Sequence, residues 1–193
     1  MNLISTNFPQ IDTVSARILA KKIVVSEITK SMYDNDNSQE TVKARELENY
    51  IVGICQLLDV TDVFIAESGS ALDVEVKADI GIELKDGTCL ILQVKSSEQA
   101  AKQHINKVVN YKGRKYPAPS VIWVKDKNTV KILQLLVREL NIPISNDVKE
   151  AVSLARKLKG KSLPIKMLNL SYKQIKALNM LNLAKVKADQ IVF

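Results

Sequence analysis

An alternation of apolar and polar residues over positions 74–84 is the feature that most constrains how this chain can fold. Apolar side chains occupy every second position, and charged residues or glycine stand between them. This period of two is typical of a strand with one buried face. Residues 89–96 follow after a short connection and are apolar on both faces as far as Gln93, which predicts a buried central strand. The two segments predict neighbouring strands of one sheet.

The connection between these segments decides which side chains share a face. A two-residue turn at positions 86 and 87 would place Asp79 and Gln93 on opposite faces. A three-residue loop over 85–87 instead puts Asp79 directly across from Gln93, and Gly87 stands where that loop needs a left-handed residue. We expect the three-residue loop. Lys95, two residues beyond Gln93, then lies on the same face.

The remaining elements are predicted from hydrophobic periodicity, capping residues and turn residues. Helices are expected over residues 13–32, 38–58, 98–112, 129–140 and 146–159 and from Ser171 onward, and strands over 62–66 and 120–125. In the first helix, Val14 and Ile18 begin an apolar stripe. The order predicts an α/β fold with an α-β-β-β-α-β core, a mixed central sheet and extra helices at both ends.

Three regions are expected along the chain. Residues 1–37 form an N-terminal helical extension, residues 38–140 form the core, and residues 141–193 form a basic helical region for DNA contact or dimerisation. The net charge of +7 lies wholly in the last region, because residues 1–140 hold 18 basic and 18 acidic residues while residues 141–193 hold 10 and 3. Such a distribution favours a polyanionic partner, nucleic acid before membrane, although a plain solvated basic surface would look the same.

Composition excludes several classes of protein. Of the 193 residues 46% are apolar and 25% are charged, which suits a globular domain with a sizeable core. Cys55 and Cys89 cannot form a disulfide framework, and with His104 they are too few and too far apart for a Cys/His zinc site. Because the sequence has neither a signal peptide nor an apolar run of about 20 residues, we expect a cytoplasmic protein without a membrane partner. Bound to DNA, it would be associated with the nucleoid.

Asp79, Gln93 and Lys95 together suit the hydrolysis of a phosphodiester. The diester is anionic and repels hydroxide, so a divalent cation is needed to neutralise it and to lower the pKa of a bound water. Mg²⁺ prefers oxygen ligands and takes few of them from protein. Asp79 offers a carboxylate oxygen and Gln93 an amide oxygen. Lys95 can orient or deprotonate the water and stabilise the developing negative charge.

The order of elements over about residues 38–140, with Ala78-Asp79 in the second strand and Gln93-Val94-Lys95 in the third, resembles the PD-(D/E)XK nuclease superfamily. The resemblance implies a restriction-endonuclease-like core and a Mg²⁺-dependent endodeoxyribonuclease, with Mn²⁺ able to substitute. It also implies that Asp79 and Gln93 bind the metal and that Lys95 assists the water. Ala78 replaces the proline that names the motif. Gln93 replaces the usual acid, which removes one negative charge from the metal site.

Many members of this superfamily add a glutamate from the first core helix. Glu46 and Glu48 both border the apolar face of the expected helix over 38–58. The residues Ile51-Val52 after Glu48 resemble the spacing in resolvases, so Glu48 is the preferred catalytic and metal-binding residue. The replacement of an acid by Gln93 raises the importance of this glutamate.

The expected function is a restriction-type or homing-type endonuclease that acts on duplex or branched DNA as a homodimer. A Holliday-junction resolvase is the nearest alternative. A catalytically inactive DNA-binding module and a basic regulatory or assembly protein are alternatives from other classes.

Several serine, lysine and arginine residues are weaker candidates for contacts with DNA. Serines after the first and third core strands can contact phosphate or can belong to turns and helix caps. A basic cluster near position 113 can bind phosphate or can interact with a helix dipole. These candidates are Ser68, Ser70, Ser96, Lys112, Arg114 and Lys115.

Overall fold

The computed structural model describes residues 2–21, 39–158 and 170–181. The chain divides into two compact units. Unit 1 comprises Met1–Gly53 and Val60–Asp126, and unit 2 comprises Ile54–Asp59 and Lys127–Phe193. This division differs from the predicted boundaries, because residues before position 37 supply strands to the sheet of unit 1 and the helix over 129–140 belongs to unit 2.

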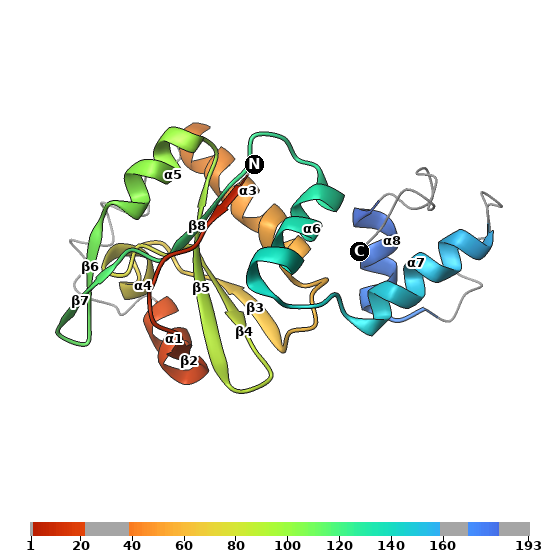
Figure 1. Cartoon of the computed structure of the whole chain (residues 1–193), viewed down its shortest axis with the longest axis horizontal. Helices are drawn as coiled ribbons and strands as arrows, with labels where there is room; N and C mark the ends of the chain where they lie inside the picture. Colours follow the sequence, from red (N-terminus) through yellow and green to blue (C-terminus); the bar gives the residue numbers. More distant parts are fainter. Residues whose placement is uncertain (1, 22–38, 159–169, 182–193) are drawn as a thin grey trace. The chain divides into compact units, whose positions relative to one another are not determined.

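Unit 1 is built around a mixed sheet (Figure 1). Its strands are β1 (Asn2–Ile4), β2 (Ile11–Asp12), β3 (Asp62–Ile65), β4 (Ile80–Glu83), β5 (Thr88–Lys95) and β8 (Ser120–Trp123). They are ordered β1-β8-β5-β4-β3, and β2 also pairs with β5. Among the described residues β5 and β8 are the one parallel pair, while the other pairs are antiparallel. The predicted α/β class with a mixed sheet is confirmed, and the short strands β1 and β2 were not predicted.

The register of β4 against β5 is the predicted one. Glu83 pairs with Cys89, and the pairing continues to Ile80 with Leu92. The three-residue loop over 85–87 closes the hairpin, and Gly87 has a φ of 82°, the left-handed conformation that this loop requires.

The second predicted strand is shorter than expected. Residues Ala71–Val74 form the short helix α4, and Lys77, three residues before the start of β4, has a left-handed φ of 63°. The alternation of apolar and polar residues over 74–78 does not mark a strand. Val76 and Ala78 are buried in a cluster with Leu72 of α4, so they pack beneath the sheet and not along a strand.

The helix predicted over residues 98–112 is wrong in its second half. Helix α5 (Glu98–Ile105) ends early, and β6 (Val108–Tyr111) and β7 (Arg114–Pro117) form a separate hairpin. Lys112 and Gly113 make its two-residue turn with φ values of 48° and 73°. Positive φ at both positions is typical of the turn that matches strand twist in tight hairpins.

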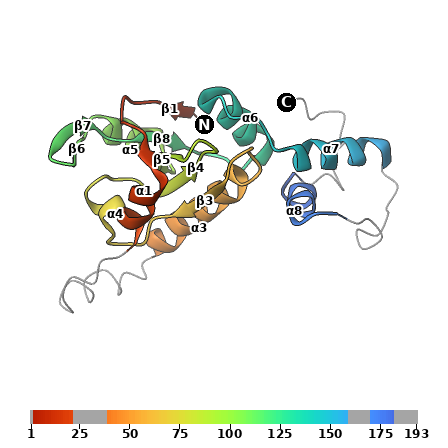
Figure 2. The same ribbon diagram turned by 90° about the horizontal axis from the view of Figure 1, so that it is seen from below.

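The N-terminal helix α1 (Thr13–Ala20) ends where Lys21 becomes extended, twelve positions before the predicted end at residue 32. Residues 22–38, which include the rest of that predicted helix and the predicted start of the next one, lie outside the described part of the chain. The predicted apolar stripe is also wrong for this helix, because Val14 and Ile18 are exposed and the small residues Ala16 and Ala20 face the core. Figure 2 shows α1 beside α4.

Helix α3 (Gln39–Cys55) follows, in place of the helix predicted over 38–58. In unit 2, α6 (Thr129–Leu140) has its predicted bounds, and α7 (Asn146–Leu158) agrees with the helix predicted over 146–159. Ser171 and Gln174 form the predicted capping box at the start of α8 (Tyr172–Met180). None of the helices in the described ranges is long and apolar enough to cross a membrane.

Candidate active site

The β4–β5 hairpin brings Asp79 and Gln93 together. The side-chain amide Nε2 of Gln93 donates a hydrogen bond to Oδ2 of Asp79. The backbone N–H of Val94 donates to the same oxygen at 2.8 Å. The expected pairing of these two side chains is therefore confirmed, and it follows from the register that the three-residue loop imposes.

Lys95 and Glu48 complete an electrostatic cluster with Asp79. Burial raises the pKa of Asp79 to about 6, against the opposing effects of the Lys95 charge and of the hydrogen bonds from Val94 and Gln93. Burial raises the pKa of Glu48 to about 7, the charge of Asp79 adds to this, and Lys95 again opposes it. The charges of Asp79, Glu48 and Lys95 therefore influence one another, and Lys95 shares the face of β5 that carries Gln93 because it lies two residues further along the strand.

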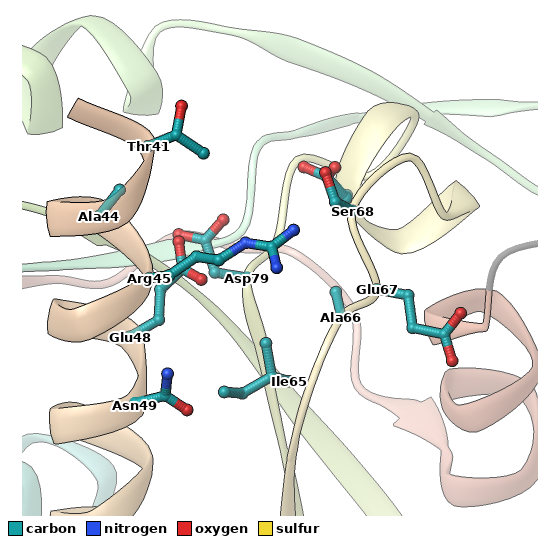
Figure 3. A pocket seen from close by; sticks show the side chains of 11 residues that line it. Thr41, Ala44, Arg45, Glu48, Asn49, Ile65, Ala66, Glu67, Ser68 and Asp79 are labelled. Atoms are coloured by element: carbon teal, nitrogen blue, oxygen red, sulfur yellow. The ribbon is translucent and has the colours of Figure 1, made fainter. Parts of the chain in front are cut away.

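The structure separates the two glutamates that the sequence left open. Glu48 is half-buried and lines a pocket together with Asp79, whereas Glu46 is exposed on α3 and does not line this pocket. The side chain of Glu48 lies beside that of Asp79 in Figure 3.

This pocket has a volume of about 540 Å³ and lies within unit 1. One side is formed by helix α3 and the other by the end of β3 and the loop that leads to α4 (Figure 3). Its lining residues are Thr41, Ala44, Arg45, Glu48, Asn49, Ile65, Ala66, Glu67, Ser68, Asp73 and Asp79.

Several lining residues were not predicted. Thr41, Arg45 and Glu48 are spaced four and three residues apart, so they share one helix face. Once Glu48 had been chosen, this spacing could have predicted that Thr41 and Arg45 also face the pocket. Asp73 had no such signal because it lies on the unpredicted helix α4. Its Oδ2 accepts a hydrogen bond of 2.8 Å from the backbone N–H of Gly69, and its charge contributes to the raised pKa values of Glu48 and Asp79.

The weaker DNA-contact candidates occupy different places. Ser68 lines the pocket. Ser70 is fully buried and its hydroxyl caps α4, so we leave it out of any proposed DNA surface. Ser96 is exposed just after β5. The serine that caps the next helix, α5, is its neighbour Ser97. The basic candidates Lys112, Arg114 and Lys115 are exposed on the β6–β7 hairpin and do not line the pocket.

The donor groups at the pocket fit a hard divalent cation. Glu48 and Asp79 supply two carboxylates, and Gln93 supplies a neutral amide beside Asp79. No group of three histidine, cysteine or acidic side chains in the described part of the chain is arranged to hold a metal. Mg²⁺ is compatible with this donor set because it commonly takes one or two carboxylates and keeps several waters.

The chain matches no protein-family model, no curated protein and no solved structure.

Proposed function

We propose that this chain is a Mg²⁺-dependent endodeoxyribonuclease with a PD-(D/E)XK-like core, and that it acts on duplex or branched DNA, most simply as a homodimer. The observation that carries the proposal is the hydrogen bond between Gln93 and Asp79 at the β4–β5 hairpin, with Glu48 of α3 lining the same pocket as Asp79. Lys95 lies two residues beyond Gln93 on the same face of β5. An acid, an amide and a lysine in this arrangement suit metal-assisted hydrolysis of a phosphodiester.

The chain's own residues would divide the work as follows. Asp79 and Glu48 would hold the cation with their carboxylate oxygens, and the Gln93 amide would complete the donor set. A cation bound there would neutralise the phosphodiester and lower the pKa of a bound water. The Lys95 ammonium would orient the attacking water and stabilise negative charge on the phosphate oxygens. The Val94 N–H would hold the Asp79 carboxylate in place.

The test is cleavage of a supercoiled plasmid and of a four-way junction with and without Mg²⁺ or Mn²⁺. Lys95→Ala and Asp79→Asn should each lower the cleavage rate by at least about 100-fold while DNA binding is retained. Lys131→Ala is a matched control, because Lys131 is exposed on α6 and belongs to no part of the site. Cleavage that survives both site variants would refute the proposal. Preference for the junction over the plasmid would favour a resolvase.

A catalytically inactive DNA-binding module is the second candidate. It is favoured by Gln93, which stands on β5 where an active site of this kind would have a second acid, and by the arrangement of the acids, because no three acidic, histidine or cysteine side chains in the described ranges are placed to hold a metal. DNA binding without cleavage in Mg²⁺, Mn²⁺ and Ca²⁺ would identify this alternative.

A further inference from the structure

The pocket extends well beyond the two carboxylates that would bind a metal. Its volume of about 540 Å³ lies within the range of roughly 300–1,000 Å³ that is typical of small-molecule sites. Of the residues that line it, only Glu48 and Asp79 have a role in the proposed chemistry. Gln93 and Lys95 do not line it. This additional space can take a part of the substrate next to the reacting group.

Arg45 is the basic residue of the pocket lining. It follows Thr41 by one helical turn and precedes Glu48 by three residues, a spacing that allows an ion pair with Glu48. No hydrogen bond or ion pair to the Arg45 guanidinium occurs in the described part of the chain, and Figure 3 shows its side chain extending from α3 across the pocket toward the Ser68 loop. Within the described residues its N–H donors therefore have no protein partner and can bind a ligand.

The lining holds four acids and one arginine, so an anionic ligand would have to enter together with a cation. Ser68 contributes a hydroxyl to the lining. Asp73 is turned toward its own loop by the bond from Gly69. Glu48 and Asp79 repel an anion unless a cation neutralises them. A planar guanidinium with a neighbouring hydroxyl suits a phosphate group, which arginine binds in a bidentate manner.

We propose that, in the nuclease proposed above, on which this assignment rests, Arg45 and Ser68 bind the DNA phosphate adjacent to the scissile one. The pocket then spans two consecutive phosphates of one strand. The first lies at Asp79 and Glu48, and the second at Arg45 and Ser68. Arg45 acts as a positioning residue that aligns the strand over the reacting centre.

The experiment measures cleavage and binding separately. Wild type, Arg45→Gln, Arg45→Lys and Lys43→Gln are compared for kcat and KM on a short duplex with Mg²⁺. The same changes are then made in a Lys95→Ala chain, which leaves the DNA intact, and DNA affinity is measured at several salt concentrations. Lys43 is the matched control because it is exposed on the same helix and does not line the pocket.

Arg45→Gln should raise KM and weaken binding by about 10-fold or more, the effect of losing one charged hydrogen-bonding group. It should also reduce the salt slope by about one. Arg45→Lys should lie between wild type and Arg45→Gln, because it keeps the charge and loses the planar fork. Lys43→Gln should change affinity by less than about twofold.

The outcomes distinguish this inference from the proposed function. If wild type cleaves and Arg45→Gln behaves like Lys43→Gln, the nuclease stands and the phosphate site is refuted. If wild type binds DNA without cleaving it and Arg45→Gln weakens that binding, Arg45 binds a DNA phosphate, but the nuclease is refuted and with it the placement beside a scissile phosphate. If the chain neither binds nor cleaves DNA, both are refuted.

Discussion

The side-chain amide of Gln93 donates a hydrogen bond to the Asp79 carboxylate, and the backbone N–H of Val94 donates to the same oxygen. These two neutral donors stabilise a carboxylate whose pKa is raised to about 6 by burial. The amide at position 93 therefore stabilises the ionised form of Asp79, the form that can bind a cation. An acid there would place two negative charges side by side.

We predict that Gln93→Glu makes the folded state dependent on a divalent cation. At about pH 8 without metal, the added carboxylate should repel Asp79 and lower the free energy of unfolding by about 1–3 kcal/mol. Mg²⁺ should restore most of that loss, and cleavage activity should be retained. Urea unfolding with EDTA and with Mg²⁺ measures the difference.

Gln103→Glu provides the control, because Gln103 is exposed on α5 away from the site. Its stability should respond to Mg²⁺ as that of the wild type does. An equal response of Gln93→Glu and Gln103→Glu would show that position 93 does not face a cation site.

Arg17 should be essential for the burial of Glu83. Glu83 is 5% exposed in β4, and its carboxylate pairs with Arg17, which also binds Asp62 at 2.6 Å. Arg17→Met leaves the buried carboxylate without a partner and should lower the free energy of unfolding by about 1–3 kcal/mol, less than for a fully buried pair because Arg17 is 44% exposed. Chemical denaturation measures the change.

Two further variants test this interpretation of Arg17. Adding Glu83→Gln to Arg17→Met should recover at least half of the lost stability, because the uncompensated charge is removed. Arg138→Met breaks an exposed pair with Glu139 and should change stability by less than about 0.5 kcal/mol. If Arg17→Met and Arg138→Met lower the free energy of unfolding equally, Arg17 is not needed to compensate the charge of the buried Glu83.

The part of the site that could be predicted from sequence depends on local geometry. The alternation of side chains along a strand and the demand of a three-residue loop for a left-handed glycine were enough to place Asp79 across from Gln93. Both are properties of a few neighbouring residues. The helix bounds of α6 and the capping box at Ser171 were predicted for the same reason.

The errors occurred where long-range packing or a turn outweighed a local pattern. Val76 and Ala78 alternate like strand residues, yet they are buried against α4 and α1 in a cluster that forms only in the folded chain. The β6–β7 hairpin carried a partial signal, since Gly113 follows the β-branched and aromatic segment Val108–Tyr111, although Arg114–Pro117 after it has only one aromatic residue. Pocket residues such as Asp73 depended on an unpredicted helix and could not be found from spacing.

His104 should make the folded chain sensitive to acid. It is 2% exposed, and its Nε2 lies 3.0 Å from the carbonyl oxygen of Pro119, to which the neutral ring donates. Burial lowers the pKa of His104 from its ordinary value, the Pro119 bond opposes this, and the charges of Lys95 and Lys107 add to the lowering. As pH falls through 6.5 the unfolded chain takes up a proton that the folded chain resists, so His104 contributes to the loss of stability on acidification.

His104→Gln removes this titration while an amide can still donate to Pro119. The difference in free energy of unfolding between wild type and His104→Gln should therefore shift in favour of the variant between about pH 7 and pH 5. Urea unfolding at intervals over that range measures it. A difference that does not change with pH would mean that the ring titrates normally in the folded state.

Gly81 should tolerate no side chain because a ring already covers it. Gly81 pairs with Phe64 across β3 and β4, and a Cβ built on Gly81 would overlap Cζ of that ring. The ring also lies 5.1 Å from the Arg17 guanidinium carbon, so it cannot move aside without losing that contact. Gly81→Ala should lower the free energy of unfolding by about 1–3 kcal/mol through overpacking.

A smaller residue at position 64 tests whether overlap with the Phe64 ring is what destabilises Gly81→Ala. Phe64→Leu should make the added cost of Gly81→Ala clearly smaller than it is in the wild-type background, which a double-mutant cycle of chemical denaturation measures. Gly87→Ala is the contrasting change, because its φ of 82° strains an alanine while no atom lies within 4 Å of the new Cβ. Its cost of about 1 kcal/mol should be independent of residue 64. Equal costs of Gly81→Ala with phenylalanine and with leucine at position 64 would show that the ring does not occupy the space above Gly81.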